Sequence, residues 1–152
     1  MAAVTSDTSS FQALTFGLQG EIFALDADSV REILDVIPVT EVPGAGDFVG
    51  GLINVRGKVA PLADLRVKFG MEQQPHTTDT RFVVVEIELA GEPTIVALLA
   101  DKAYEVTEIG AASIEEAPAI GMRWRADYVK GIAKRDGEFI IIPDMGRIFA
   151  AG

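Results

Sequence analysis

The sequence lacks most of the residues from which catalytic and metal sites are built. It contains no cysteine, which excludes disulfides and thiolate metal sites, and it has a single histidine, His76. A Ser-His-carboxylate triad would need His76 as its base, yet it lies in a polar loop with no nucleophile context around it. Motifs for calcium, zinc or phosphate binding are also missing. We therefore expect no catalytic residue, no metal and no cofactor.

Positive charge is scarce as well. The chain has 13 basic and 23 acidic side chains and a formal net charge of −10, which repels nucleic acid backbones and anionic membrane surfaces. Its longest apolar runs, such as 93–100, are far shorter than the roughly 20 residues that cross a bilayer. The N-terminus has neither the basic nor the apolar region of a signal peptide. These features predict a cytoplasmic protein that binds no nucleic acid and does not insert into a membrane.

Length and composition are typical of one globular domain. The 152 residues are 49% hydrophobic, with a mean hydropathy of +0.28, enough to bury a substantial core. Residues 1–10 are polar and are expected to form a flexible tail, so the domain should span 11–150. The polar, turn-rich segment 71–80 is the best internal boundary and is predicted to divide two β-barrel subdomains.

Short apolar runs separated by tight turns predict an all-β fold with roughly nine or ten strands. The expected strands are 14–18, 21–25, 49–56, 58–65, 82–89, 93–99, 103–109, 128–133 and 139–142. A short helix is predicted after Asp28 or Ser29, since Val30, Ile33 and Leu34 would share one face. Further helical turns are expected before Gly70 and after Asp144. No sequence repeat is visible, although both halves consist of hairpins of similar size.

The stretch 48-FVGGLINVRGKVAPLADLRVKFG-70 interrupts its most apolar part with Arg56, Gly57 and Lys58. An X-Gly pair between two strand-like runs predicts a tight hairpin turn, with Gly57 in the left-handed conformation. Pro61 cannot donate to a sheet, which places its strand at an edge or at a bulge. The two cations either keep the turn solvated or mark a protein-binding edge, where arginine is favoured because its planar fork binds carboxylates and carbonyls.

This stretch resembles the core motif of CheW-like domains, G-x-x-N-x-R-G-x-x-x-P-x-x-D-L-x-x-x-F-G. The matching residues are Gly51, Asn54, Arg56, Gly57, Pro61, Asp64, Leu65, Phe69 and Gly70. The preceding Val30, Glu32 and Ile33 and the ending 128–149 also fit, so that the resemblance covers about 11–149.

The resemblance implies two five-stranded SH3-like β-barrels packed on a shared hydrophobic core. It also implies a non-enzymatic chemotaxis adaptor that couples methyl-accepting chemoreceptors to the histidine kinase CheA in signalling arrays at the membrane. The partners would be the cytoplasmic tip of the receptor and the regulatory domain of the kinase. Gly57 would be a structural turn, and the resemblance assigns no individual residue to kinase binding. The implied receptor-binding residues are Val30, Glu32, Asn54, Arg56 and Val59.

Two other functions are compatible with a small β-barrel. A hydrolase could use a pair of groove carboxylates such as Glu32 and Asp64. Asp64, however, stands beside Leu62 and Leu65, where a structural hydrogen-bonding role is more natural. A barrel that holds a small ligand inside is the other alternative, but short strands with bulky interior residues favour a filled barrel.

Overall fold

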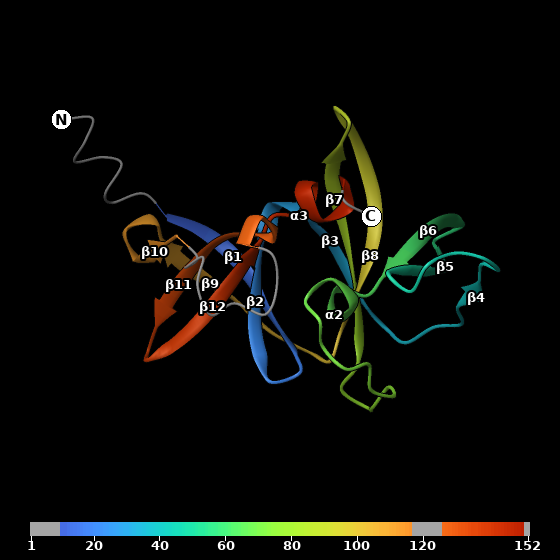
Figure 1. The fold of residues 1–152 in the computed structure, drawn as a ribbon, viewed down its shortest axis with the longest axis horizontal. Helices are drawn as coiled ribbons and strands as arrows, with labels where there is room; N and C mark the ends of the chain where they lie inside the picture. The colour runs from blue at the N-terminus through green and yellow to red at the C-terminus, as the bar shows by residue number, and fades with distance from the viewer. Residues whose placement is uncertain (1–9, 117–125, 151–152) are drawn as a thin grey trace.

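The computed structural model describes residues 10–116 and 126–150, whose strands form two six-stranded sheets that lie side by side (Figure 1). The first sheet has the order β10-β11-β12-β2-β1-β9, and the second has the order β3-β7-β8-β6-β5-β4. The first sheet is built from β1 (Ser10–Leu18), β2 (Glu21–Asp26), β9 (Lys102–Gly110), β10 (Ile114–Glu115), β11 (Val129–Arg135) and β12 (Glu138–Pro143). The second is built from β3 (Val30–Asp35), β4 (Thr40–Glu41), β5 (Val49–Val55), β6 (Lys58–Ala63), β7 (Arg81–Leu89) and β8 (Glu92–Ala100).

The helices are short connectors. They are the 3-10 turns η1 (Ala27–Ser29), η2 (Ala111–Ser113) and η3 (Ala126–Tyr128), and the α-helices α2 (Leu65–Lys68) and α3 (Met145–Ala150). Each sheet contains one strand of only two residues, β10 or β4, beside five longer ones. The mainly-β prediction is therefore confirmed, with five principal strands on each side.

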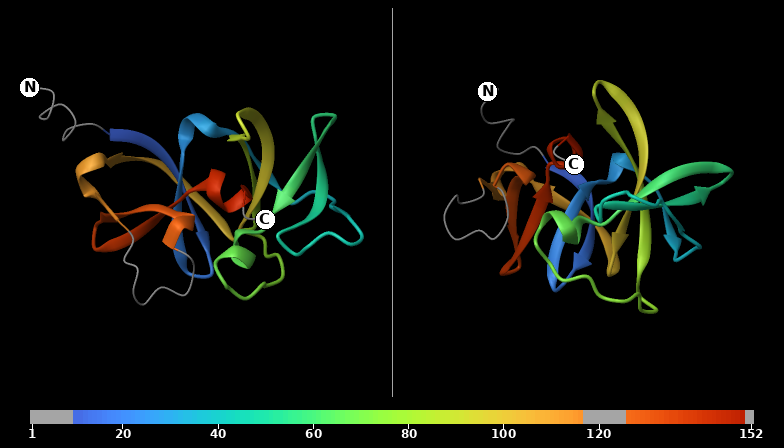
Figure 2. Two further views of the ribbon diagram at one scale, coloured as in Figure 1. Left: turned by 45° about the horizontal axis from the view of Figure 1, so that its top comes forward. Right: turned by 45° about the vertical axis from the view of Figure 1, so that its right-hand side comes forward.

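The two sheets interleave along the sequence. The chain leaves the first sheet after β2, builds the whole second sheet from β3 to β8, and returns at β9 (Figure 2). Residues 71–80, the predicted boundary between two subdomains, connect α2 to β7. Since α2 follows β6, and β6 and β7 belong to the same sheet, this segment does not separate the two sheets. Of the expected tail, Ser10 is the first residue of β1 and donates a hydrogen bond to Glu108. Residues 1–9 lie outside the described residues.

Three apolar cores explain why the strands read as continuous hydrophobic runs. On β7, Val83 and Val85 face a core shared by both sheets, whereas Phe82 and Val84 face a core inside the second sheet. A third core, including Ile109 and other residues of the first sheet only, fills that sheet. Central strands that are buried on both faces show no polar alternation. The shared core that the resemblance implied is present and joins the two sheets.

Tight turns close the hairpins as predicted. Each has a non-glycine residue followed by a glycine, both with positive φ, the conformation of a type I′ turn. The pairs are Gln19-Gly20, Arg56-Gly57, Ala90-Gly91 and Asp136-Gly137.

Two local predictions were wrong. The helix expected after Asp28 is only the 3-10 turn η1, and Val30 opens the strand β3, which pairs with β7. Leu34 pairs with Phe82 in this ladder, so sheet pairing outweighs a weak helical pattern that is rich in β-branched residues. The strand of Pro61 was expected at an edge or with a bulge at Pro61, but β6 lies between β5 and β8, and the bulge in the β5–β6 pairing lies on β5, between Val49 and Gly51. The pairing of β6 with β8 covers Leu62 and Ala63 only, so no donor is required from Pro61 on that side.

The structure contains a repeated unit, although no repeat was visible in the sequence. The unit is a bulged strand, a two-residue turn, a second strand, an aspartate and a short helix, and it occurs once in each sheet. It is marked at constant spacing by the pairs Val49/Val129, Gly51/Gly131, Gly57/Gly137, Asp64/Asp144 and Phe69/Phe149.

The last of the repeated residues in each unit reaches the other sheet. Phe69, at the end of the second sheet's unit, packs edge-on against Phe23 of β2, with ring centroids 5.2 Å apart. Phe149, from the first sheet's unit, packs against Phe48 at 5.0 Å, beside the start of β5. The two sheets thus hold each other by reciprocal contacts.

Candidate protein-binding site

The tip of the β5–β6 hairpin is built by its own side chains. Arg56 has a φ of 53° and Gly57 a φ of 85°, so the two residues form the turn. The Asn54 Oδ1 atom accepts a hydrogen bond of 2.8 Å from the Gly57 backbone N–H. Asn54, expected as a contact residue, therefore fixes the geometry of the turn and sets the direction in which Arg56 leaves the hairpin.

Arg56 is held by Glu32 on β3. The Arg56 Nε donates to Glu32 Oε2 at 2.9 Å and Nη2 donates to Oε1 at 3.2 Å, which is a two-pronged pair. The hydrogen bond and the negative charge of Glu32 both raise the pKa of Arg56, so the guanidinium stays charged at any physiological pH. The Arg56 side chain is nevertheless 81% exposed. Glu32 orients the fork while leaving most of it accessible to a partner.

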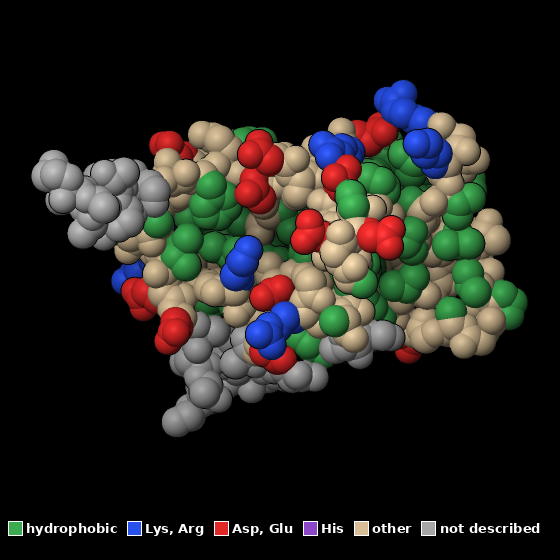
Figure 3. All heavy atoms as spheres, turned by 90° about the horizontal axis from the view of Figure 1, so that it is seen from above, with side chains coloured by type: hydrophobic (Ala, Val, Ile, Leu, Met, Phe, Trp, Pro, Cys, Tyr) green, Lys and Arg blue, Asp and Glu red, His purple; other side chains and the backbone are tan. Residues whose placement is uncertain are grey.

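Val59 supplies exposed apolar surface beside this pair. It pairs with Asn54 across the hairpin and is 70% exposed, an unusual position for a valine. An apolar hollow adjoins it, lined by Ile37, Pro38, Thr40, Leu52, Ile53, Asn54 and Val59. Apolar side chains gather on this end of the molecule, where β4, β5 and β6 lie (Figure 3). An exposed arginine next to an apolar hollow is the composition of a protein-binding surface.

Val30 lies apart from the other expected site residues. A bulge at Arg31 makes Val30 pair with Val85 and Glu32 pair with Val84, which are adjacent residues on β7. Adjacent strand residues face opposite sides, so Val30 packs against the shared core while Glu32 faces the other side. The structure brings together Glu32, Asn54, Arg56 and Val59, but it does not bring Val30 into their group.

Two exposed apolar residues were not predicted as part of a binding surface. Ile33 on β3 is 44% exposed and Val106 on β9 is 56% exposed. Their cross-strand partners, Val83 and Leu14, both belong to the shared core. Ile33 and Val106 therefore lie on the core-facing sides of the two sheets, at rims where the core is uncovered. Only the register reveals this, because Ile33 was predicted on the face of a short helix and Val106 resembles any other hydrophobic residue of a strand.

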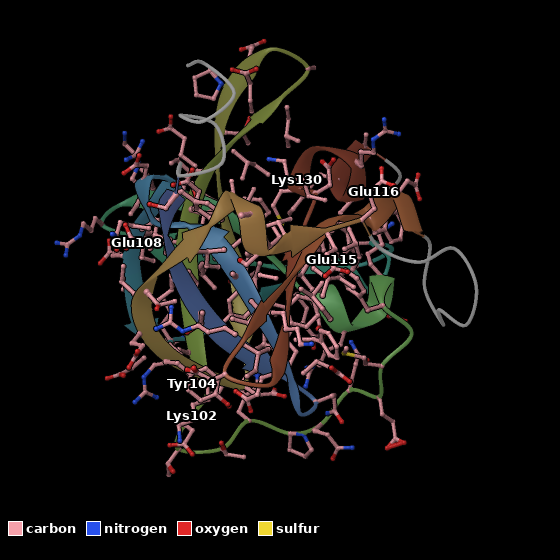
Figure 4. The ribbon with its side chains drawn as sticks, turned by 90° about the vertical axis from the view of Figure 1, so that its left-hand side faces the viewer. Lys102, Tyr104, Glu108, Glu115, Glu116 and Lys130 are labelled. Carbon is pink, nitrogen blue, oxygen red and sulfur yellow. The ribbon has the colours of Figure 1, made fainter. Side chains whose placement is uncertain are left out.

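The free edge of the first sheet is mostly charged. Figure 4 shows Lys102 and Tyr104 toward one end of β9 and Glu108 toward the other. The Lys102 ammonium lies 5.7 Å from the Tyr104 ring centroid, a cation–π distance. Charged side chains on an edge strand oppose pairing with another strand. This edge is therefore better explained as a solvated one, except at Val106.

The carboxylates considered for a hydrolase form ion pairs and hydrogen bonds with arginine groups and are not paired with each other. Glu32 is held by Arg56, whereas Asp64 caps α2 by accepting from the Arg66 N–H and also binds the Arg66 side chain. His76 is an exposed loop residue whose ring lies edge-on to Phe82. The described residues contain no cluster of histidines and carboxylates that could hold a metal ion. Within the same residues, no helix is long and apolar enough to span a bilayer.

Comparison with known proteins agrees with this architecture. The model of the CheW-like domain family matches residues 12–152, nearly the whole chain. The chain belongs to the CheW-like domain family. Similar proteins include the chemotaxis protein CheW of Klebsiella aerogenes, 26% identical over 99% of this chain and 89% of that protein. The chemotaxis protein CheW of Helicobacter pylori is 29% identical over 86% of this chain and 76% of that protein.

A solved structure supports the family fold. The scaffolding protein TtCheW from Thermoanaerobacter tengcongensis superposes with a TM-score of 0.81 at 32% identity, covering 93% of this chain and 88% of that one. The predicted resemblance and fold class are thus confirmed, and the chain is a member of a family of chemotaxis adaptors and scaffolds.

Proposed function

We propose that this protein couples chemoreceptors to the histidine kinase CheA, as a scaffold without catalytic activity of its own. The observation that carries the proposal is the Arg56 fork, oriented by Glu32 yet 81% exposed, beside the bare apolar surface of Val59. A residue that only kept a turn solvated would not need a two-pronged partner to hold its direction.

The receptor side of the proposal uses the group at the hairpin tip. Arg56 and Val59 make direct contacts with the helical tip of the receptor, while Glu32 and Asn54 position Arg56. Val30 packs against the shared core on the opposite side of β3, so a contact between Val30 and the receptor would lie outside this group. A helix tip offers carboxylates, carbonyls and apolar side chains, which suit a forked donor flanked by apolar anchors.

A coupling protein must bind two partners at once, so the kinase's regulatory domain requires a different surface. Control of the kinase would then come from holding it against the receptor in one arrangement, which is a shift between conformations and not a chemical step. Binding to the receptor tip would also bring the protein to the membrane-associated arrays.

The test measures binding of a receptor tip fragment and of a CheA regulatory domain to wild type and to Arg56→Glu. Reversal removes the forked donor and places two carboxylates side by side, so receptor affinity should fall at least about tenfold. Kinase binding should survive. Arg147→Glu is the matched control, because Arg147 is also an exposed, ion-paired arginine, 66% exposed, but lies on α3. A folded Arg56→Glu variant with normal receptor affinity would contradict the proposal.

A further inference from the structure

A buried arginine links the two sheets. The Arg66 side chain is 5% exposed and forms a two-pronged pair with Asp64, from Nε to Oδ1 and from Nη2 to Oδ2, both at 2.9 Å. Its Nη1 donates to the Gln74 carbonyl at 3.3 Å and lies 3.5 Å from Asp101 Oδ1. The other oxygen of Asp101 accepts a 2.7 Å hydrogen bond from the Gln19 backbone N–H.

These contacts run from one sheet to the other. Asp64 and Arg66 follow β6 of the second sheet, whereas Gln19 is in the β1–β2 turn of the first. Asp101 is the single residue between β8 and β9, where the chain crosses back to the first sheet, and its N–H donates to the Gly17 carbonyl at 2.8 Å. The network therefore anchors α2 to the first sheet through the crossover residue.

The repeated unit shows that this arginine is not required for the unit's own fold. The first sheet's unit has Asp144 as its cap and Gly146 at the position that corresponds to Arg66. A strand, an aspartate cap and a short helix thus form in that sheet without a buried guanidinium. Burying a charged group is costly unless it is paired, so Arg66 is expected to have a role beyond its own unit.

Directionality is what the network adds to the shared core. Apolar contacts between the sheets are strong but not directional, and they tolerate small rotations of one sheet on the other. The two-pronged pair with Asp64 fixes the direction of the Arg66 guanidinium, and Asp101, which faces it at 3.5 Å, is itself held to the first sheet by hydrogen bonds with Gln19 and Gly17. The rims formed by Ile33 on β3 and Val106 on β9 belong to different sheets, and their separation depends on that angle.

We propose that Arg66 is a positioning residue that sets the angle between the two sheets through Asp101. By this means it fixes the spacing of the β3 and β9 rims for one partner that contacts both. The identity of that partner as a receptor helix tip rests on the proposed function, whereas the control of the angle does not.

The test measures the distance between the sheets directly. Because the chain has no cysteine, Asp35→Cys and Lys134→Cys place one spin label on β3 and one on β11, both at exposed positions. Pulsed electron paramagnetic resonance then gives the distribution of distances between the two labels, in the doubly labelled protein and in the same protein with Asp101→Asn. Asp101→Asn keeps an acceptor for Gln19 but removes the charge that faces Arg66. Glu86→Gln is the matched control, because Glu86 is also 35% exposed and paired with an arginine, but within the second sheet.

We expect Asp101→Asn to broaden or shift the distribution and Glu86→Gln to leave it unchanged. Affinity for a receptor tip fragment should fall about 2- to 30-fold in Asp101→Asn, the range for changes that act without touching the ligand. An unchanged distribution overturns the proposal, and so does a broadened one with unchanged affinity. Should the wild type not bind the fragment at all, the proposed function fails while the distances still decide the role of Arg66. If Asp101→Asn does not fold, Arg66→Lys, which keeps the charge and loses the fork, is measured in its place. The same change in the distance distribution and in receptor affinity is then expected.

Discussion

Replacing Gly57 by valine separates the stability of the hairpin tip from its function. Gly57 has a φ of 85°, and no heavy atom lies within 4 Å of the position that a Cβ would occupy. The added Cβ therefore meets no neighbouring atom, and the expected cost is the backbone strain of a β-branched residue in the left-handed region. Strain of this kind is about 1–3 kcal/mol, and we expect Gly57→Val to lower the free energy of unfolding by that amount.

The same substitution should also reduce receptor binding. If the turn relaxes to relieve strain, the hydrogen bond from the Gly57 N–H to Asn54 lengthens and Arg56 is no longer directed toward Glu32. Gly137→Val is the matched control, because Gly137 has a φ of 80° in the corresponding turn of the first sheet and also faces open space. It should lose similar stability and keep normal receptor affinity.

Urea denaturation gives the stabilities of the wild type, Gly57→Val, Gly137→Val and Gly46→Val, and receptor binding is then measured without urea, where each protein is folded. Gly46→Val sets the baseline, because Gly46 has open space around it and no left-handed φ, so its stability should stay close to that of the wild type. A Gly57→Val protein that unfolds at the wild-type midpoint would refute the strain argument. Equal losses of receptor affinity in Gly57→Val and Gly137→Val would refute the link between this turn and the binding site.

Three further predictions test other parts of the structure. Arg56→Glu should retain the wild-type circular dichroism spectrum, since the side chain is mostly exposed; loss of the folded spectrum would make Arg56 structural. Phe69→Ala removes a fully buried ring from the shared core and should cost about 3–5 kcal/mol in urea denaturation, whereas a cost below about 1 kcal/mol would mean that the core repacks. Gly131→Ala places a methyl group against Ile114, so it should destabilise by about 1–3 kcal/mol and increase hydrogen exchange in β10; unchanged exchange would contradict that pairing.

The parts of the fold that the sequence predicted are those set by local chemistry. Arg56-Gly57 and Asp136-Gly137 are recognisable because few residues tolerate positive φ, and an X-Gly pair between apolar runs leaves little choice of turn. Asp144 was recognisable as a cap because aspartate accepts from the backbone of a following helix, as it does from Arg147 N. These signals act over a few residues and do not depend on the rest of the chain.

The parts that were missed depend on pairing between distant segments. Whether Val30 to Leu34 forms a helix or a strand was decided by the free edge of β7, about 50 residues later in the chain. The polar segment 71–80 looked like a domain boundary, but polarity marks exposure and carries no information on which sheet follows. The burial of Arg66 was not predicted, and it depends in part on Asp101, which reaches Arg66 from the distant crossover between the sheets.

The candidate site shows how one backbone unit can serve two purposes in the same chain. The turns at Gly57 and Gly137 have the same shape, so shape alone cannot distinguish a binding tip from a structural one. What differs is the set of side chains before each glycine: Asn54 and Arg56 at one tip, Lys134 and Asp136 at the other. Glu32 lies on a neighbouring strand in reach of Arg56, and the resulting pair gives that tip a charge with a fixed direction. The proposed function of this site therefore depends on side chains placed on a repeated backbone, and Gly137 in the other copy of the repeat supplies the control with which the proposal is tested.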